Sequence, residues 1–263
     1  MIVACLKWVT HPGEPNDARF AGMSPADQSA LEFALAQAAA THVEVTVVTV
    51  GPPAAEAVLR DAVACGARHA IRIDAPAALT SAQVAEAISA AVPSAQWVWC
   101  GDYSLDRGTG SVPAFLAANF AAQQALGIIA VEGADGGRVT ATRRLDGGRR
   151  EILTVSAPAV ISVEGATAHL RRAGLGAVLA AARVQIEVRK PSSAAHAEDA
   201  VIYPYRPRAR ALAAPRGAHP LDRLRALTDA SGAAPAHGES VVLAPRDAAV
   251  RIVTALREWG YLE

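Results

Sequence analysis

A polar loop in the first half of the chain has the composition of a phosphate-binding loop. It covers residues 101–111, follows the apolar run 96–100, and has the sequence Gly-Asp-Tyr-Ser-Leu-Asp-Arg-Gly-Thr-Gly-Ser. Glycines allow a backbone to approach a phosphate closely, and the free amides of the helix expected at 112–120 attract an anion. Arg107 adds a positive charge. The alternative is an ordinary strand-to-helix connection in which Ser111 caps the helix.

The other reactive side chains do not form a catalytic or metal-binding pattern. The seven histidines have no ligand spacing, and Asp102 and Asp106 lie on a polar loop, where carboxylates are usually solvated or capping. The sequence has no GxGxxG after its first strand, no GxxxxGK[ST] and no GxSxG. Cys5, Cys65 and Cys100 lie far apart in apolar segments, which predicts buried thiols. We therefore expect a binding protein with no catalytic residue and no metal.

The overall composition excludes two further classes. Hydrophobic residues make up 52% of the 263 residues, enough for a large core, and 25 basic residues balance 25 acidic ones. A protein that binds nucleic acid by neutralising phosphates normally carries a positive excess. No apolar run approaches the ~20 residues of a membrane span, and the chain begins with a strand-like segment. We expect a cytoplasmic protein.

Strand-like and helix-like segments alternate over about the first 130 residues. Strands are expected at 2–9, 43–50, 70–73 and 96–100, and helices from Ser24 onward, at 54–65 and at 83–92. This alternation predicts an α/β fold, an open and mostly parallel sheet of Rossmann-like type with helices on both faces. Ligands bind such sheets outside the carboxyl ends of the strands, where the strand order reverses. Segments 7–9, 50–51 and 100–102 end there, and the helix start at 24–25 lies nearby.

The pattern changes after residue 130. Strand-like segments 138–143, 152–155 and 159–163 follow one another closely, and Asp-Gly-Gly at 146–148 is a hairpin signal. These strands predict an antiparallel edge on the parallel sheet. We divide the chain into an α/β domain at 1–190 and a C-terminal extension at 191–263. The extension contains expected helices at 221–228 and 246–259 and is predicted to pack against a partner.

Leu175 lies between two glycines and predicts the hydrophobic tip of a loop. Single exposed leucines are common in proteins and usually have no function. A protruding apolar side chain can nevertheless anchor a partner in a small pocket. Both interpretations are open from the residues alone.

Over about residues 1–190 the chain resembles the beta subunit of electron-transfer flavoprotein. Residues 5–9 match the A-V-K-x-V of its first strand, and 24–27 match its N-P-F-(D/C) helix start. Residues 51–67 follow its G-P…L-R-x-A-L-A-x-G-A segment, and 146–160 its D-G-G…L-P-A-V hairpin with one extra residue. Residues 171–188 align with its R-Y-A-T-L-P-N-I-M-K-A…E-V recognition loop, placed here at 165–184. Leu175 then corresponds to the leucine that docks onto partner dehydrogenases.

The resemblance implies a role in electron transfer without a catalytic residue on this chain. In this family an alpha-like and a beta-like subunit form a heterodimer that carries FAD mainly on the alpha subunit. It passes electrons from flavin-dependent dehydrogenases to a quinone-linked oxidoreductase. The beta subunit binds AMP as a structural nucleotide, and a second FAD takes that place in bifurcating members. The implied nucleotide contacts are Cys5, Ser24, Pro25, Ala26, Asp27, Val50, Gly101, Asp102, Tyr103, Ser104, Leu105, Asp106, Arg107, Gly108, Thr109, Gly110, Ser111 and Val112.

The chain also departs from the family pattern. The family loop is G-K-Q-A-I-D-D-D-C-N-Q-T-G, and this chain keeps Gly101, a matching Leu105 and Asp106. Arg107 and the residues after it would bind phosphate through amides and one cation. The lysines that follow the docking leucine are replaced at 180, 182 and 183. The loop and the ending at 259–262 are similar to an actinobacterial beta-like branch associated with mycofactocin redox systems.

A second hypothesis belongs to a different functional class. It is a stand-alone regulatory protein of the same fold, monomeric or dimeric, that binds an adenine nucleotide and needs no flavoprotein partner. A nucleotide-processing enzyme is disfavoured, because the sequence lacks phosphate-activating motifs. The presence of an alpha-like partner distinguishes the first two hypotheses.

Overall fold

The computed structural model describes residues 1–10, 21–76, 79–135, 137–191, 217–227 and 241–262. The chain divides into two compact units, residues 1–201 and residues 202–263, which we describe separately. Among the described residues, no helix is both long enough and apolar enough to cross a membrane.

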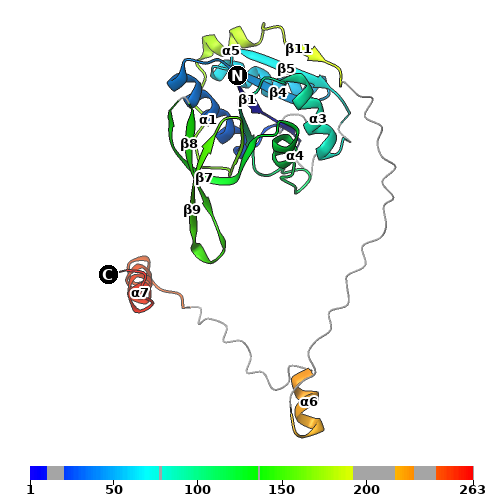
Figure 1. The fold of residues 1–263 in the computed structure, drawn as a ribbon. Coiled ribbons are helices and arrows are strands. Elements are labelled where there is room, and N and C mark those ends of the chain that lie inside the picture. The colour runs from blue at the N-terminus through cyan, green and yellow to red at the C-terminus, as the bar shows by residue number, and fades with distance from the viewer. Residues whose placement is uncertain (11–20, 77–78, 136, 192–216, 228–240, 263) are drawn as a thin grey trace. The chain divides into compact units, whose positions relative to one another are not determined.

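A central sheet organises the first unit (Figure 1). Among the described residues it has nine strands in the order β11-β5-β4-β1-β6-β10-β7-β8-β9. Neighbouring strands from β11 to β7 are parallel, and β7, β8 and β9 are antiparallel. The strand bounds are Ile2–Cys5 for β1, Val45–Gly51 for β4, His69–Asp74 for β5, Trp97–Gly101 for β6, Gln123–Asp135 for β7, Arg138–Arg144 for β8, Arg150–Ser156 for β9, Ala159–Val163 for β10 and Glu187–Arg189 for β11. The predicted fold class is confirmed.

Helices cover both faces of this sheet. On one face α1 (Pro25–Thr41) and α2 (Glu56–Cys65) pack with Trp99 of β6. On the other face α3 (Ser81–Ala91) and α4 (Val112–Asn119) pack with its neighbour Val98. Successive side chains of a strand point to opposite faces, so the continuous apolar run of β6 serves two cores.

Local signals predict the helix ends well. Ser24 caps α1 and accepts a hydrogen bond of 3.1 Å from the backbone N–H of Asp27, with Pro25 in the first helical position. Gly66 ends α2 with a φ of 124°, a conformation that favours glycine. The helix start expected at Ser24 and the helix end expected at residue 65 are confirmed.

The predicted strand at 2–9 is divided in two. β1 ends at Cys5, and β2 (Trp8–Val9) pairs antiparallel with β3 (Gly22–Met23) in a separate small sheet. The cause lies between them, because the backbone N–H of Lys7 donates to Oδ2 of Asp27 at 3.0 Å instead of to a strand. Residues 11–20, between β2 and β3, lie outside the described part of the chain.

Two further corrections concern the antiparallel edge. The segment 159–163 is not an edge strand, because β10 lies between β6 and β7 and runs parallel to both. All five residues of β10 are buried, which explains its apolar sequence. The long strand β7 has no counterpart among the predicted strands, and Gly127 and Gly133, both with positive φ, interrupt its pattern. The hairpin of β8 and β9 around residues 146–148 is confirmed.

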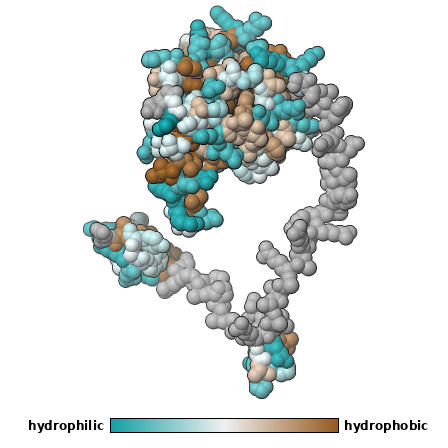
Figure 2. Space-filling view, viewed as in Figure 1, coloured by the Kyte–Doolittle hydropathy of each residue, from teal (hydrophilic) through white to brown (hydrophobic). Residues whose placement is uncertain are grey.

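The β8–β9 hairpin projects from the body of the first unit (Figure 1). Figure 2 shows a hydrophilic surface at its tip and hydrophobic surface closer to the body. The predicted helices of the extension are observed as α6 (Pro220–Leu227) and α7 (Pro245–Glu258). Residues 192–216 of the extension lie outside the described residues.

Candidate functional site

A cavity of about 240 Å³ opens at the carboxyl ends of β1 and β6. From β1 the chain continues outward to β4 and β5 and then returns to β6 on the other side of β1. The strand order therefore reverses between β1 and β6, which is the position where open α/β sheets bind their ligands. Cys5 and Cys100 are register partners across this reversal, and both line the cavity.

The structure brings most of the expected nucleotide contacts to this one cavity. Those that line it are Cys5, Ser24, Asp27, Val50, Gly101, Tyr103, Ser104, Asp106, Arg107, Thr109, Gly110, Ser111 and Val112. The expected contacts outside its lining are Pro25, Ala26, Asp102, Leu105 and Gly108. Leu105 is exposed at the outer side of the loop. These expected contacts thus come from four segments far apart in sequence.

The loop at 102–111 folds back on itself beside the cavity. The backbone N–H of Ser104 donates to the carbonyl oxygen of Thr109 at 2.8 Å, and that of Gly108 donates to the carbonyl oxygen of Ser104 at 2.8 Å. A Cβ atom on Gly110 would lie 1.9 Å from the carbonyl oxygen of Asp102, so the loop requires glycine there. Ser111 occupies the N-cap position of α4, as the alternative interpretation expected, but its side chain makes no capping hydrogen bond.

Two cationic side chains connect this loop with other segments of the cavity lining. Nζ of Lys7 lies 2.5 Å from Oδ1 of Asp106 and donates to Oγ of Ser104 at 2.8 Å. Nη1 of Arg107 donates to the carbonyl oxygen of Leu79 at 2.5 Å. Partial burial raises the pKa of Asp106, but the hydrogen bonds from Lys7 and Ser104 outweigh it, and the net pKa is lowered. Asp106 is therefore ionised at neutral pH and holds Lys7 at the cavity.

The two cysteines at the strand ends are uncharged thiols. Contact with the Cys5 thiol and burial both raise the pKa of the Cys100 thiol well above its usual value. Both cysteines are free thiols, as expected, and both are buried. Uncharged thiols and two cationic side chains in one lining fit a ligand that has an apolar ring and an anionic group.

Asp27 is a buried carboxyl group next to the loop. It accepts hydrogen bonds from the backbone N–H of Lys7 and of Gly101, and from the Ser24 side chain. Burial nevertheless dominates these bonds and raises the pKa of Asp27 to about 6. A Cβ atom on Gly101 would lie 2.5 Å from Oδ1 of Asp27, so the end of β6 directly contacts the Asp27 carboxyl group.

We expect Asp27 to make stability depend on pH. Its folded pKa of about 6 exceeds the ordinary aspartate value of 3.8, so ionisation opposes folding and stability falls as pH rises between these values. Relative to Asp27→Asn, the wild-type free energy of unfolding should fall by about 3 kcal/mol from about pH 3.5 to pH 7. Urea unfolding of both proteins over this range measures the difference. A difference that does not change with pH would contradict the assignment.

Some lining residues were not among the expected contacts. Lys7 lies in one of the strand-end segments noted in the sequence, and Gly51 is the last residue of β4. Leu79, Ser81 and Val84 come from the start of α3 and the turn before it. The sequence has no local signal for them, because only the packing of α3 against α4 brings them to this edge.

Leu175 lies on another surface of the first unit. It is the first residue of a short helix, α5 (Leu175–Ala181), and not the tip of a loop as expected. Its side chain is 75% exposed, and Val178 and Leu179 of the same helix are also exposed. These three side chains form an apolar surface, which we call the α5 surface.

Comparison with known proteins agrees with this geometry. The family described as "Electron transfer flavoprotein domain" matches residues 17–194. Protein FixA of Rhizobium meliloti (strain 1021) is 30% identical over 189 residues, which cover 68% of this chain and 64% of that protein. The electron transfer flavoprotein subunit beta of Thermoanaerobacterium thermosaccharolyticum is 31% identical over 144 residues, 53% of this chain and 55% of that protein. The chain thus spans less than two thirds of the length of these relatives.

Proposed function

The chain belongs to the electron transfer flavoprotein domain family, and on this premise we propose that it acts as the beta-like subunit of a heterodimeric electron carrier. Its partner would be an alpha-like subunit that holds FAD. The observation that carries the proposal is the cavity between β1 and β6, whose lining includes the residues that match the family's nucleotide loop. An electron carrier of this kind needs a bound nucleotide and a docking surface, and the chain has candidates for both.

We propose AMP as the nucleotide in the cavity. The volume of about 240 Å³ lies just below the ~300–1,000 Å³ of most ligand pockets, which suits a mononucleotide better than a dinucleotide. Lys7 and Arg107 lie at the loop side and can hold a phosphate, together with the amides near Gly110. Cys5 and Cys100 offer an uncharged surface for the base. A second FAD in this place would need a wider cavity.

The chain itself would bind and orient the nucleotide and dock onto the dehydrogenase. Electrons would pass from a flavin-dependent dehydrogenase to the FAD of the alpha-like subunit and then to a quinone-linked oxidoreductase. Transfer between flavins depends on how close the cofactors come and requires no acid–base residue here. We therefore propose a carrier subunit, not a catalyst, in which the α5 surface contacts the dehydrogenase through Leu175.

We propose that the extension at 191–263 packs against the alpha-like subunit. In α7 the side chains of Val250 and Ile252 are exposed, as is Trp259 directly after it. An exposed group of large apolar side chains on one helix is typical of a surface that a partner covers.

The nucleotide content of the complex tests the proposal. The chain is co-expressed with an alpha-like, FAD-binding protein encoded beside it, the complex is purified and denatured, and the released nucleotides are counted by chromatography. We expect one FAD and one AMP per heterodimer. Two FAD per heterodimer would mean that a second flavin occupies the cavity in place of AMP. AMP without any partner would favour the stand-alone regulatory protein, and neither nucleotide nor partner would refute the proposal.

A further inference from the structure

The α5 surface is carried by a segment that crosses the outside of the first unit. Residues 164–189 leave β10, pass over α1 and α2, and end in β11 beside β5. Oγ of Ser29 in α1 donates to the carbonyl oxygen of Ala168 at 3.0 Å. What holds α5 within this segment decides where the exposed Leu175 points.

Before α5 the segment is held by one ion pair. Nη2 of Arg171 lies 2.7 Å from Oε1 of Glu32 in α1, and Nε of Arg171 lies 3.0 Å from Oε2. Partial burial raises the pKa of Glu32, but the hydrogen bonds from Arg171 outweigh it and lower the net pKa. Glu32 is therefore ionised at neutral pH, and the start of the segment is fixed to α1.

After α5, Arg60 of α2 holds the segment, together with the burial of Ala181 and Ile186. Nη1 of Arg60 donates to the carbonyl oxygens of Ala181, Ala182 and Val184 at 3.0, 3.1 and 2.9 Å. The last carbonyls of a helix have no partner within the helix and carry a partial negative charge. The two N–H groups of this nitrogen are thus shared among three backbone acceptors at and just after the end of α5.

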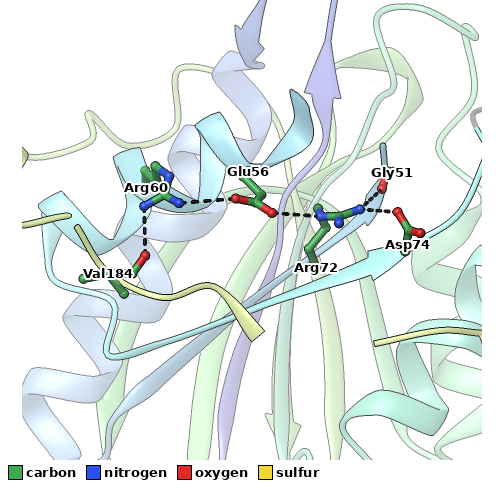
Figure 3. A network of polar contacts seen from close by, with 6 residues as sticks. All are labelled: Gly51, Glu56, Arg60, Arg72, Asp74 and Val184. Atoms are coloured by element: carbon green, nitrogen blue, oxygen red, sulfur yellow. Dashed lines mark hydrogen bonds and ion pairs between the residues drawn. The ribbon is translucent and has the colours of Figure 1, made fainter. Parts of the chain in front are cut away.

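Arg60 is itself fixed by a network that reaches the sheet (Figure 3). Its Nη2 donates to Oε2 of Glu56 at 3.3 Å, and Oε1 of Glu56 accepts from Nε of Arg72 at 3.2 Å. Arg72 is buried, and its Nη1 donates to the carbonyl oxygen of Gly51 at 3.0 Å and to Asp74. Gly51 also lines the cavity, so the network extends from the cavity edge to the α5 segment.

The helix α5 needs such external support. It has seven residues, and Gly174 before it offers no side-chain cap. Isolated helices shorter than about 12 residues are marginal in water, so α5 depends on tertiary contacts. Its three exposed apolar side chains contribute little, because they are not packed in the free chain.

From this arrangement we propose that Arg60 is the positioning residue of the docking surface. Held by Glu56 and Arg72, it keeps α5 helical and Leu175 oriented before a dehydrogenase arrives. A surface ordered in advance binds without the cost of ordering it during association. The importance of this role for electron transfer rests on the proposed docking function, whereas the ordering of α5 by Arg60 does not.

Hydrogen exchange of the full chain tests the ordering directly. We compare wild type with Arg60→Gln, and with Arg68→Gln as a matched control, because Arg68 follows the same helix, is exposed and forms its ion pair with Glu44, away from α5. Loss of charge-assisted hydrogen bonds should accelerate exchange at the amides of 178–184 by about tenfold or more, while α2 and the control are unchanged. Equal exchange in Arg60→Gln and wild type, or the same acceleration in the control, would overturn the proposal.

A double-mutant cycle tests the functional consequence. The probe is a flavin-dependent dehydrogenase that reduces the wild-type complex, and the quantity is its KM for the complex as acceptor. Arg60→Gln and Leu175→Ala should each raise this KM with kcat retained, and the double variant should be no worse than Leu175→Ala alone.

The outcomes separate the two ideas. If Leu175→Ala leaves KM unchanged, the docking function fails and the exchange experiment alone decides on Arg60. If Leu175→Ala raises KM but Arg60→Gln does not, the positioning role is refuted although docking stands. If the effects of Arg60→Gln and Leu175→Ala on KM add in full in the double variant, Arg60 has a general structural role instead.

Discussion

Arg72→Met is expected to lower the free energy of unfolding of the full chain by about 3 kcal/mol. Arg72 is 5% exposed on β5, and its guanidinium contacts Glu56, Asp74 and the carbonyl oxygen of Gly51. Removing one partner of a buried pair leaves the others without compensation, which typically costs about 3–5 kcal/mol. Asp74 is about half exposed and can turn to water, so we expect the lower end of that range.

Urea unfolding measures this loss, and Arg68→Met provides the control. Arg68 also forms an ion pair, with Glu44, but both side chains are well exposed, and such pairs contribute at most about 1 kcal/mol. Arg72→Lys should fall between wild type and Arg72→Met, because an ammonium group keeps the charge but cannot reproduce the planar set of donors. A loss below about 1 kcal/mol in Arg72→Met would show that water replaces the guanidinium.

Gly110→Ala is expected to weaken AMP binding by about tenfold or more, since a displacement of about 1 Å in a site can cost a hundredfold. The new Cβ would lie 1.9 Å from the carbonyl oxygen of Asp102, far inside contact distance. The loop at 102–111 must therefore shift relative to the cavity it lines. The shift would move the amides and Arg107 away from the place proposed for the phosphate.

Calorimetric titration of the chain with AMP tests this expectation. Gly22→Ala is the matched control, because Gly22 lies on β3, has no positive φ, and offers open space within 4 Å of the position that a Cβ would take. The control should bind as wild type does. Equal affinities for wild type and Gly110→Ala would mean that the nucleotide does not contact this loop.

Several features of the fold can be predicted because their causes are local. Ser24 and Pro25 set the start of α1, Gly66 ends α2, and the β-branched run at 45–51 forms a strand. The alternation of such elements dictates parallel crossovers, and these place the ligand site at the end of β6. The position of the loop at 101–111 therefore follows from the residues alone.

Other features could not be predicted, because distant residues decide them. The apolar run at 2–9 has the pattern of one strand. The side chain of Asp27 accepts a hydrogen bond from the backbone N–H of Lys7, and this bond divides the run into two strands. The segment 159–163 follows a hairpin in sequence, yet it enters the parallel sheet between β6 and β7. In both cases a long-range hydrogen bond or pairing overrides the local pattern.

The amino-acid sequence by itself determined the class of fold, the helix ends and the edge of the sheet where a ligand would bind. Only the tertiary structure decided the state of Asp27, since its pKa depends on burial by residues around it. The same holds for α5, where a helix replaces the expected loop tip because Arg60 holds carbonyl groups 121 to 124 positions further along the chain. Periodicity and capping act within a few residues, whereas burial and long-range hydrogen bonds exist only once the chain has folded.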